Sequence, residues 1–96
     1  MALLLAPACA GPDNAPHPSL AAIWRDYREL PSHRALAIAG YPERARWVAG
    51  ASGGNPTREA AEQRAIDECL ERRQRQRVQS PCRLYATGDE IVWSSP

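Results

Sequence analysis

Two cysteines, Cys69 and Cys82, constrain the fold of this chain more than any other feature. Cys69 lies inside a strongly helical run, and Cys82 opens the apolar run that follows, so a reversal of the chain would bring the two side chains together. In an exported domain that is too small for a large core, such a pair is most often a disulfide. Closing a loop of roughly 14 residues would stabilise the fold by about 3 kcal/mol.

Three other roles for the two cysteines stay open at this point. A structural zinc site would need two more ligands, and His17 and His33 lack the paired spacing of a zinc module. A cysteine-dependent enzyme would need a neighbour that favours the thiolate, whereas Cys69 lies on an apolar helix face. Two free, buried thiols are the expectation if the protein stays in the cytoplasm. We therefore predict no metal site and rank the enzyme last.

The length and the charge of the chain exclude several classes of protein. With 96 residues it can form only one small domain around one core. Its 12 basic and 11 acidic residues nearly cancel, so no net field marks a dedicated nucleic-acid binder. All the basic residues are arginines, and without lysine the chain can be neither a Schiff-base enzyme nor a P-loop nucleotide site. We expect no cofactor and no specific nucleic-acid partner.

The first ten residues, MALLLAPACA, have the outline of the end of a signal peptide, because a short apolar run is followed by small residues. We predict that residues 1–10 are a signal-peptide remnant, that residues 11–18 form a Pro-rich disordered tether, and that residues 19–96 form a single small α+β domain. The protein would then be periplasmic or secreted. Lipidation at Cys9 is a competing interpretation. No stretch approaches the roughly 20 apolar residues that span a membrane.

The pattern of apolar residues predicts a helix followed by a hairpin. In residues 19–30 the apolar side chains recur at the spacing of an amphipathic helix, with Ser19 placed to cap it and Pro31 to end it. The segments RALAIAG and ARWVAGAS are short apolar runs with turn residues between them, which indicates two antiparallel strands. Their small residues would let another element pack closely against them.

A long helix is predicted next, beginning at Asn55 or Thr57 and ending at Ser80. Its predicted buried face, in which alanines allow close approach to a sheet, consists of Ala61, Ala65, Ile66, Cys69 and Leu70. The runs CRLYA and EIVW then form a second hairpin around a turn at residues 87–89. The expected fold class is α+β: an N-terminal amphipathic helix, then β-β-α-β-β, with a small antiparallel sheet packed on one long helix.

Two groups of side chains could form a binding surface. Arginines near the end of the long helix suit bidentate contacts to phosphates, lipid headgroups or acidic glycans. Acidic residues on the same helix neutralise much of this charge, so a solvated helix end is the preferred interpretation. The candidate anion-binding residues are Arg72, Arg73, Arg75, Arg77 and Arg83. The second group is Trp24, Trp47 and Trp93, for which packing in the core is preferred to lining a groove.

Several segments taken together resemble a known group of proteins. The runs ALAIAG, WVAGAS, TREAAEQRAIDEC and CRLYATGDEIVW, within residues 35–93, resemble small bacterial secreted domains of unknown function, the type catalogued as domain of unknown function 4189 and its relatives. The matching positions are Ala61, Ala65, Cys69 and Cys82. The resemblance implies an envelope or extracellular setting and a bridge between the two cysteines. It supplies no catalytic residues.

The function expected from the sequence is a non-enzymatic secreted or periplasmic interaction module, stabilised by a Cys69–Cys82 disulfide. Its partner would be a protein or a glycan of the envelope or the exterior. One alternative is a weak binder of anionic polymers or lipid headgroups through the arginine-rich helix end. The last alternative is a cysteine-dependent enzyme.

Overall fold

The structure is a computed structural model that describes residues 19–43 and 46–93. The predicted signal-peptide remnant at residues 1–10, the tether at residues 11–18 and the lipidation candidate Cys9 all lie outside the described residues. Within these described residues, two helices and four strands follow one another in the predicted order. They are α2 (Leu20–Tyr27), β1 (Ala35–Gly40), β2 (Trp47–Ser52), α3 (Arg58–Gln76), β3 (Cys82–Thr87) and β4 (Glu90–Ile91).

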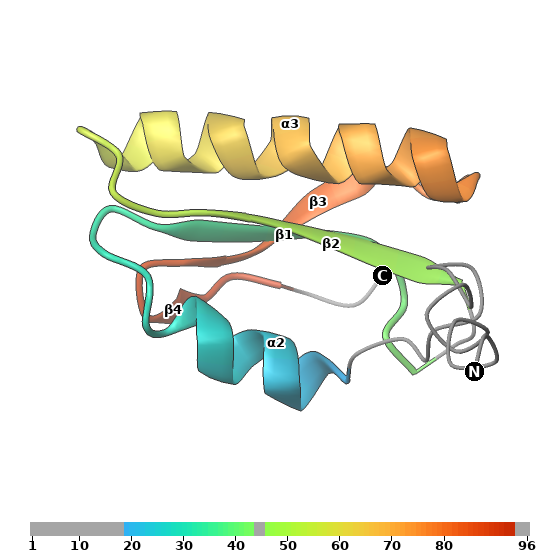
Figure 1. Ribbon diagram of the computed structural model, residues 1–96, viewed down its shortest axis with the longest axis horizontal. Coiled ribbons are helices and arrows are strands. Elements are labelled where there is room, and N and C mark those ends of the chain that lie inside the picture. Colours follow the sequence, from blue (N-terminus) through green and yellow to red (C-terminus); the bar gives the residue numbers. More distant parts are fainter. Residues whose placement is uncertain (1–18, 44–45, 94–96) are drawn as a thin grey trace, which may run out of the picture.

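The four strands form one antiparallel sheet in the order β2-β1-β3-β4. Both predicted hairpins, β1 with β2 and β3 with β4, are present, and β1 joins them by pairing with β3. In Figure 1, α3 runs along one face of the sheet, while α2 lies on the opposite side, next to β4. The predicted α+β fold is therefore confirmed.

A bulge in β3 decides which side chains face each helix. Leu36 pairs with Ala86 and Ala37 pairs with Leu84, which leaves Tyr85 as an extra residue in β3. Tyr85 and Ala86 consequently both pack on the side of α2, whereas Leu84 packs on the side of α3. The α3 face of the sheet comprises Ala35, Ala37, Ala39, Val48, Cys82 and Leu84. The α2 face comprises Leu36, Ala49, Tyr85 and Ala86.

Small residues bring α3 unusually close to the sheet, as the sequence predicted. The contact surface of the helix is formed by Ala61, Ala65 and Cys69, all fully buried. A Cβ atom on Gly50 of β2 would lie 2.3 Å from the backbone nitrogen of Cys69 and 2.8 Å from the carbonyl oxygen of Ala65. No side chain can occupy this position unless the helix and the strand move apart.

The predicted buried face of α3 is wrong at one position. Leu70 is 41% exposed, and Ile66 is only partly buried against the core. Ala61, Ala65 and Cys69 follow one another at intervals of four residues and point to the sheet together, while Leu70 is rotated by about 100° from Cys69. These three residues form the contact stripe, the narrow line along which α3 packs on the sheet. Leu70 lies outside the contact stripe.

Hydrogen bonds at the start of α3 decide between its two predicted N-terminal caps, Asn55 and Thr57. The helix begins after Thr57, whose hydroxyl accepts the backbone N–H of Ala60 at 3.0 Å. Asn55, the other predicted cap, is buried instead, and its side-chain amide donates to the carbonyl oxygen of His33 and to the hydroxyl of Ser52. Asn55 therefore ties the loop before β1 to the end of β2.

The helix α3 ends at Gln76, before the predicted limit at Ser80. Arg77 adopts a left-handed conformation with φ 57°, and the N–H groups of Arg77 and Val78 donate to the carbonyls of Gln74 and Arg73. These two bonds define a Schellman motif, which normally uses glycine at the left-handed position. Since Arg77 fills that position, the sequence held no glycine to signal the end of the helix.

Two other elements, α2 and β4, also end earlier than predicted. Ser19 caps α2 as predicted, with its hydroxyl accepting the N–H of Ala22 at 3.1 Å, but the helix stops at Tyr27 and continues as a turn. Strand β4 ends at Ile91, because the N–H groups of Val92 and Trp93 both donate to the carbonyl of Tyr85. That carbonyl belongs to the bulged residue, so the bulge also ends the pairing of β4.

Candidate functional site

Cys69 of α3 and Cys82 of β3 form the predicted disulfide, with their Cα atoms 6.1 Å apart. The bond joins the helix to the strand that follows it and lies on the α3 face, where Cys69 is fully buried and Cys82 is partly buried. Because the two sulfur atoms are bonded to each other, neither is available as a thiolate nucleophile or as a metal ligand in this state. In the part of the chain that the structure describes, there is also no cluster of three metal-binding side chains.

Two of the candidate anion-binding arginines are engaged in contacts within the fold. Arg72 forms an ion pair with Glu68 at 3.2 Å and donates to the carbonyl oxygen of Ala49 in the edge strand β2. Arg73 donates to the carbonyls of Val78 and Gln79, and so supports the chain just after α3. Both side chains stabilise the helix end that was considered as a binding surface.

The remaining three candidates do not share one surface. Arg75 and Arg77 are exposed at the end of α3. Arg83 lies on the other side of the sheet, where its guanidinium carbon is 4.1 Å from the centre of the Trp93 ring. The structure therefore separates Arg83 from the four helix arginines.

A row of aromatic rings covers the α2 face. Tyr41 contacts Trp93 with ring centroids 6.3 Å apart, and Trp93 contacts Tyr85 at 5.8 Å. Tyr85 contacts Trp24 at 6.1 Å, and Trp24 contacts Tyr27 at 5.3 Å. Of these five rings only Tyr27 is fully buried, and the other four are half-buried. We call these five side chains the aromatic row.

Two arginines lie over rings of the aromatic row. Arg83 covers Trp93, and Arg34 lies 5.5 Å from the centre of the Tyr27 ring. Both distances allow cation–π attraction. Core packing was predicted for all three tryptophans, and it describes Trp47, which is 4% exposed, better than the half-buried Trp24 and Trp93.

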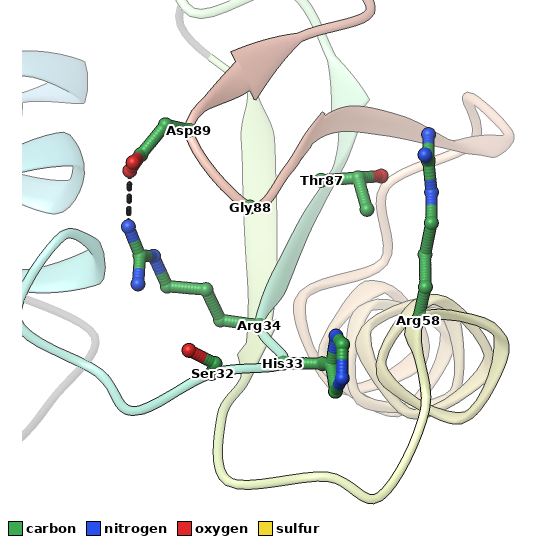
Figure 2. A pocket seen from close by; sticks show the side chains of 7 residues that line it. All are labelled: Ser32, His33, Arg34, Arg58, Thr87, Gly88 and Asp89. Carbon is green, nitrogen blue, oxygen red and sulfur yellow. Dashed lines mark hydrogen bonds and ion pairs between the residues drawn. The ribbon is translucent and has the colours of Figure 1, made fainter.

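A separate pocket of about 330 Å³ lies at the end of the sheet, where three distant segments meet. Figure 2 shows the loop before β1, the first residue of α3 and the turn between β3 and β4 converging on it. Its lining consists of Ser32, His33, Arg34, Arg58, Thr87, Gly88 and Asp89. The pocket was not predicted from the sequence, because each of these residues is unremarkable in its own segment.

Arg34 is the most strongly held side chain of the pocket. It donates to the carbonyl oxygen of Leu30 at 3.2 Å and forms an ion pair with the carboxylate of Asp89. Its side chain is 14% exposed, whereas that of Asp89 is 74% exposed. Next to it, the Tyr27 hydroxyl donates to the carbonyl oxygen of Gly88 at 2.8 Å. Burial raises the pKa of Tyr27 above its ordinary value of 10.0, although the Arg34 charge acts in the opposite direction.

Arg58 enters the pocket from the opposite side and is paired differently. Its Nε atom lies 3.1 Å from an oxygen of Glu62, and the hydroxyl of Thr87 donates to the same oxygen at 2.9 Å. Arg58 is 54% exposed. The pocket thus has one largely buried and fixed guanidinium, one exposed guanidinium, and the imidazole of His33 between the two arginine side chains (Figure 2).

Comparison with known proteins matches no family model, no curated protein and no solved structure. The resemblance described from the sequence therefore stays a prediction. Within residues 19–43 and 46–93, neither helix has both the length and the apolar character needed to cross a membrane.

Proposed function

We propose that this protein is a non-enzymatic interaction module of the periplasm or the cell exterior, and that it contacts its partner through the aromatic row. The observation that carries the proposal is the half-buried state of Trp24, Tyr41, Tyr85 and Trp93 on one face of the sheet. Tryptophan, tyrosine and arginine are the residues that contribute most to binding at protein interfaces.

The geometry of the row supports a binding surface more than a closed core. The rings contact one another edge-on or tilted, and four of the five stay half-buried, so part of each of these four side chains is open to a partner. Arg83 packs on Trp93 and Arg34 packs on Tyr27, so two rings of the surface are held in place before a partner arrives. A rigid aromatic surface loses little conformational entropy on binding, which favours affinity.

The proposed compartment is supported by the disulfide. Disulfides persist in oxidising compartments and are rare in the cytoplasm, and they are common in small exported domains with limited cores. The Cys69–Cys82 bond closes a loop with a sequence separation of 13 residues in a domain whose α3 face is built largely from alanines. The apolar start of the sequence and the resemblance to small bacterial secreted domains agree with the same setting.

The location is tested by intact mass, measured with and without a thiol-alkylating reagent on protein recovered separately from the exported and the cytoplasmic fractions. We expect exported protein that lacks the first residues and takes up reagent only after reduction. Cytoplasmic protein with two reactive thiols would contradict the proposed compartment.

The binding surface is tested by photocrosslinking in cells that produce the full chain. A photoreactive phenylalanine analogue replaces Tyr85 in one variant, and in the control variant it replaces Gln63, which is exposed on α3. We expect a discrete crosslinked product from position 85 alone, with a lower yield after Arg83→Gln. Equal crosslinking from both positions would contradict a partner surface at the aromatic row.

A further inference from the structure

We propose that the pocket between Arg34 and Arg58 binds a small ligand with two carboxylate groups, and that Asp89 occupies the site of one of them until the ligand displaces it. This inference does not rest on the proposed function, because the ligand would contact the end of the sheet and not the aromatic row. It is built from the contacts of Arg34, from the exposure of Asp89 and from the second cationic group across the pocket.

Arg34 has the properties of a fixed carboxylate receptor. Its guanidinium donates a hydrogen bond to the carbonyl of Leu30 and lies over the ring of Tyr27. Tyr27 is itself fixed by the hydrogen bond from its hydroxyl to the carbonyl of Gly88. A buried guanidinium held in this way needs no reordering to bind an anion. Arginine also presents its donors as a planar fork that matches the two oxygens of a carboxylate.

The present contacts of Arg34 leave part of this fork unused. One Nη atom donates to Leu30 and the other donates to a single oxygen of Asp89. The Nε atom is buried and has no hydrogen-bond partner in the structure. A buried donor without an acceptor is unfavourable, so a carboxylate that reaches both Nε and the adjacent Nη would relieve a penalty that Asp89 leaves in place.

Asp89 is suited to act as a displaceable occupant. It lies in the turn between β3 and β4 and is 74% exposed, so its carboxylate can leave Arg34 and be solvated at little cost. Figure 2 shows the Asp89 side chain reaching Arg34 from the turn, at the rim of the pocket.

The second anionic group of the ligand would meet Arg58. This side chain is 54% exposed, and its partner Glu62 is also held by the hydroxyl of Thr87. Arg58 could therefore turn towards the pocket while Glu62 keeps one hydrogen bond. His33 and Ser32 line the space between the two arginines and add polar groups that can bind the middle of the ligand. The volume of about 330 Å³ suits a small molecule.

The experiment is an NMR titration of the full chain with succinate at constant ionic strength, with succinamide as the uncharged control. We expect saturable shifts at the amides of Gly88 and Asp89 with succinate only. Asp89→Asn removes the internal carboxylate and should tighten succinate binding about five- to tenfold. A variant that unfolds would lose affinity for succinate, so a gain in affinity cannot result from unfolding. Equal shifts with both compounds, or unchanged affinity in Asp89→Asn, would overturn the proposal.

Loss-of-binding variants complete the test. Arg34→Lys keeps the charge but lacks the planar fork, and Arg58→Gln removes the second cation, so each should weaken succinate binding at least tenfold. Arg64→Gln, on the exposed surface of the same helix as Arg58, should leave binding unchanged. An equal loss in Arg64→Gln would show a general effect of charge and would overturn the site. A blocked aspartate, which has a single carboxylate, should bind more weakly than succinate, and equal or tighter binding would overturn the need for two carboxylate groups.

Discussion

The two faces of the sheet are built in opposite ways. On the α3 face, alanines and Gly50 bring helix and strands into close contact, and the Cys69–Cys82 disulfide joins them covalently. On the α2 face, half-buried aromatic rings and two arginines take the place of the alanines, and the helix α2 has only eight residues. The comparison indicates that the two faces have different roles. The α3 face stabilises the fold, and the α2 face keeps aromatic and arginine side chains available for contact with a partner.

Removal of the disulfide, on the α3 face, is expected to change the free energy of unfolding more than any other substitution considered. The double variant Cys69→Ala with Cys82→Ala should lose about 3 kcal/mol of unfolding free energy, because the unfolded chain is no longer constrained by the closed loop. Denaturant unfolding measures this loss. A reducing agent should destabilise the natural protein to a similar degree and leave the variant unchanged. An unaltered unfolding midpoint in the variant would contradict the account of the α3 face.

The close approach of α3 is tested next by Gly50→Ala. The added methyl group would collide with the backbone of Cys69, so we expect a loss of about 2–3 kcal/mol, at the upper end of the range for overpacking. Thermal or denaturant unfolding gives the value. The matched control is Ala51→Val, one position along β2, where the side chain is exposed and the expected change is below about 0.5 kcal/mol.

Tyr27 tests the α2 face at its most buried point. Tyr27→Phe removes the hydrogen bond to Gly88 and should cost about 1 kcal/mol. The substitution should also change the response to alkaline pH. Since burial raises the pKa of Tyr27, the folded state keeps the proton longer than the unfolded state does. This contribution is complete below the ordinary pKa of 10.0 and is lost as pH rises towards the folded value.

The measurement for Tyr27 is denaturant unfolding as a function of pH above neutrality. The natural protein should lose stability more steeply than Tyr27→Phe above about pH 10, with Arg34 and Asp89 as the charged neighbours in both proteins. Parallel curves would show that Tyr27 does not titrate differently in the folded state.

The smallest effect is expected for Leu70→Gln. Leu70 is on α3 but outside its contact stripe, so the change in unfolding free energy should be within about 0.5 kcal/mol. Ile66→Gln, in the partly buried position, is the comparison variant and should cost more. Equal costs at both positions would show that the contact stripe of α3 is wider than the structure indicates.

The α3 face was largely predictable from the sequence, because its signals are local. Alanines at intervals of four residues and a cysteine in the same series predict a helix that packs closely, and they mark three of its buried positions. The end of the helix was missed, since the left-handed residue is Arg77 and not a glycine. Leu70 was misplaced because a helical pattern does not reveal how narrow the contact stripe will be.

The α2 face and the pocket could not be predicted, because both depend on pairings between distant segments. The bulge at Tyr85 arises only when β3 pairs with β1, and it is this bulge that turns Tyr85 towards Trp24. The pocket likewise needs the sheet to bring Arg34 next to Asp89. Neither arrangement has a signal in the spacing of residues along the chain.

Native-state hydrogen exchange, measured for individual amides of the oxidised protein, tests the division between the two faces most directly. The account predicts that amides of α3 and β1 exchange only through global unfolding, while those of α2 exchange through local opening and are about a hundredfold less protected. Reduction of the disulfide should then lower the protection of α3 and β1 and have little effect on α2. Equal protection of α2 and α3 would contradict the account, because it would show that both faces unfold as one unit.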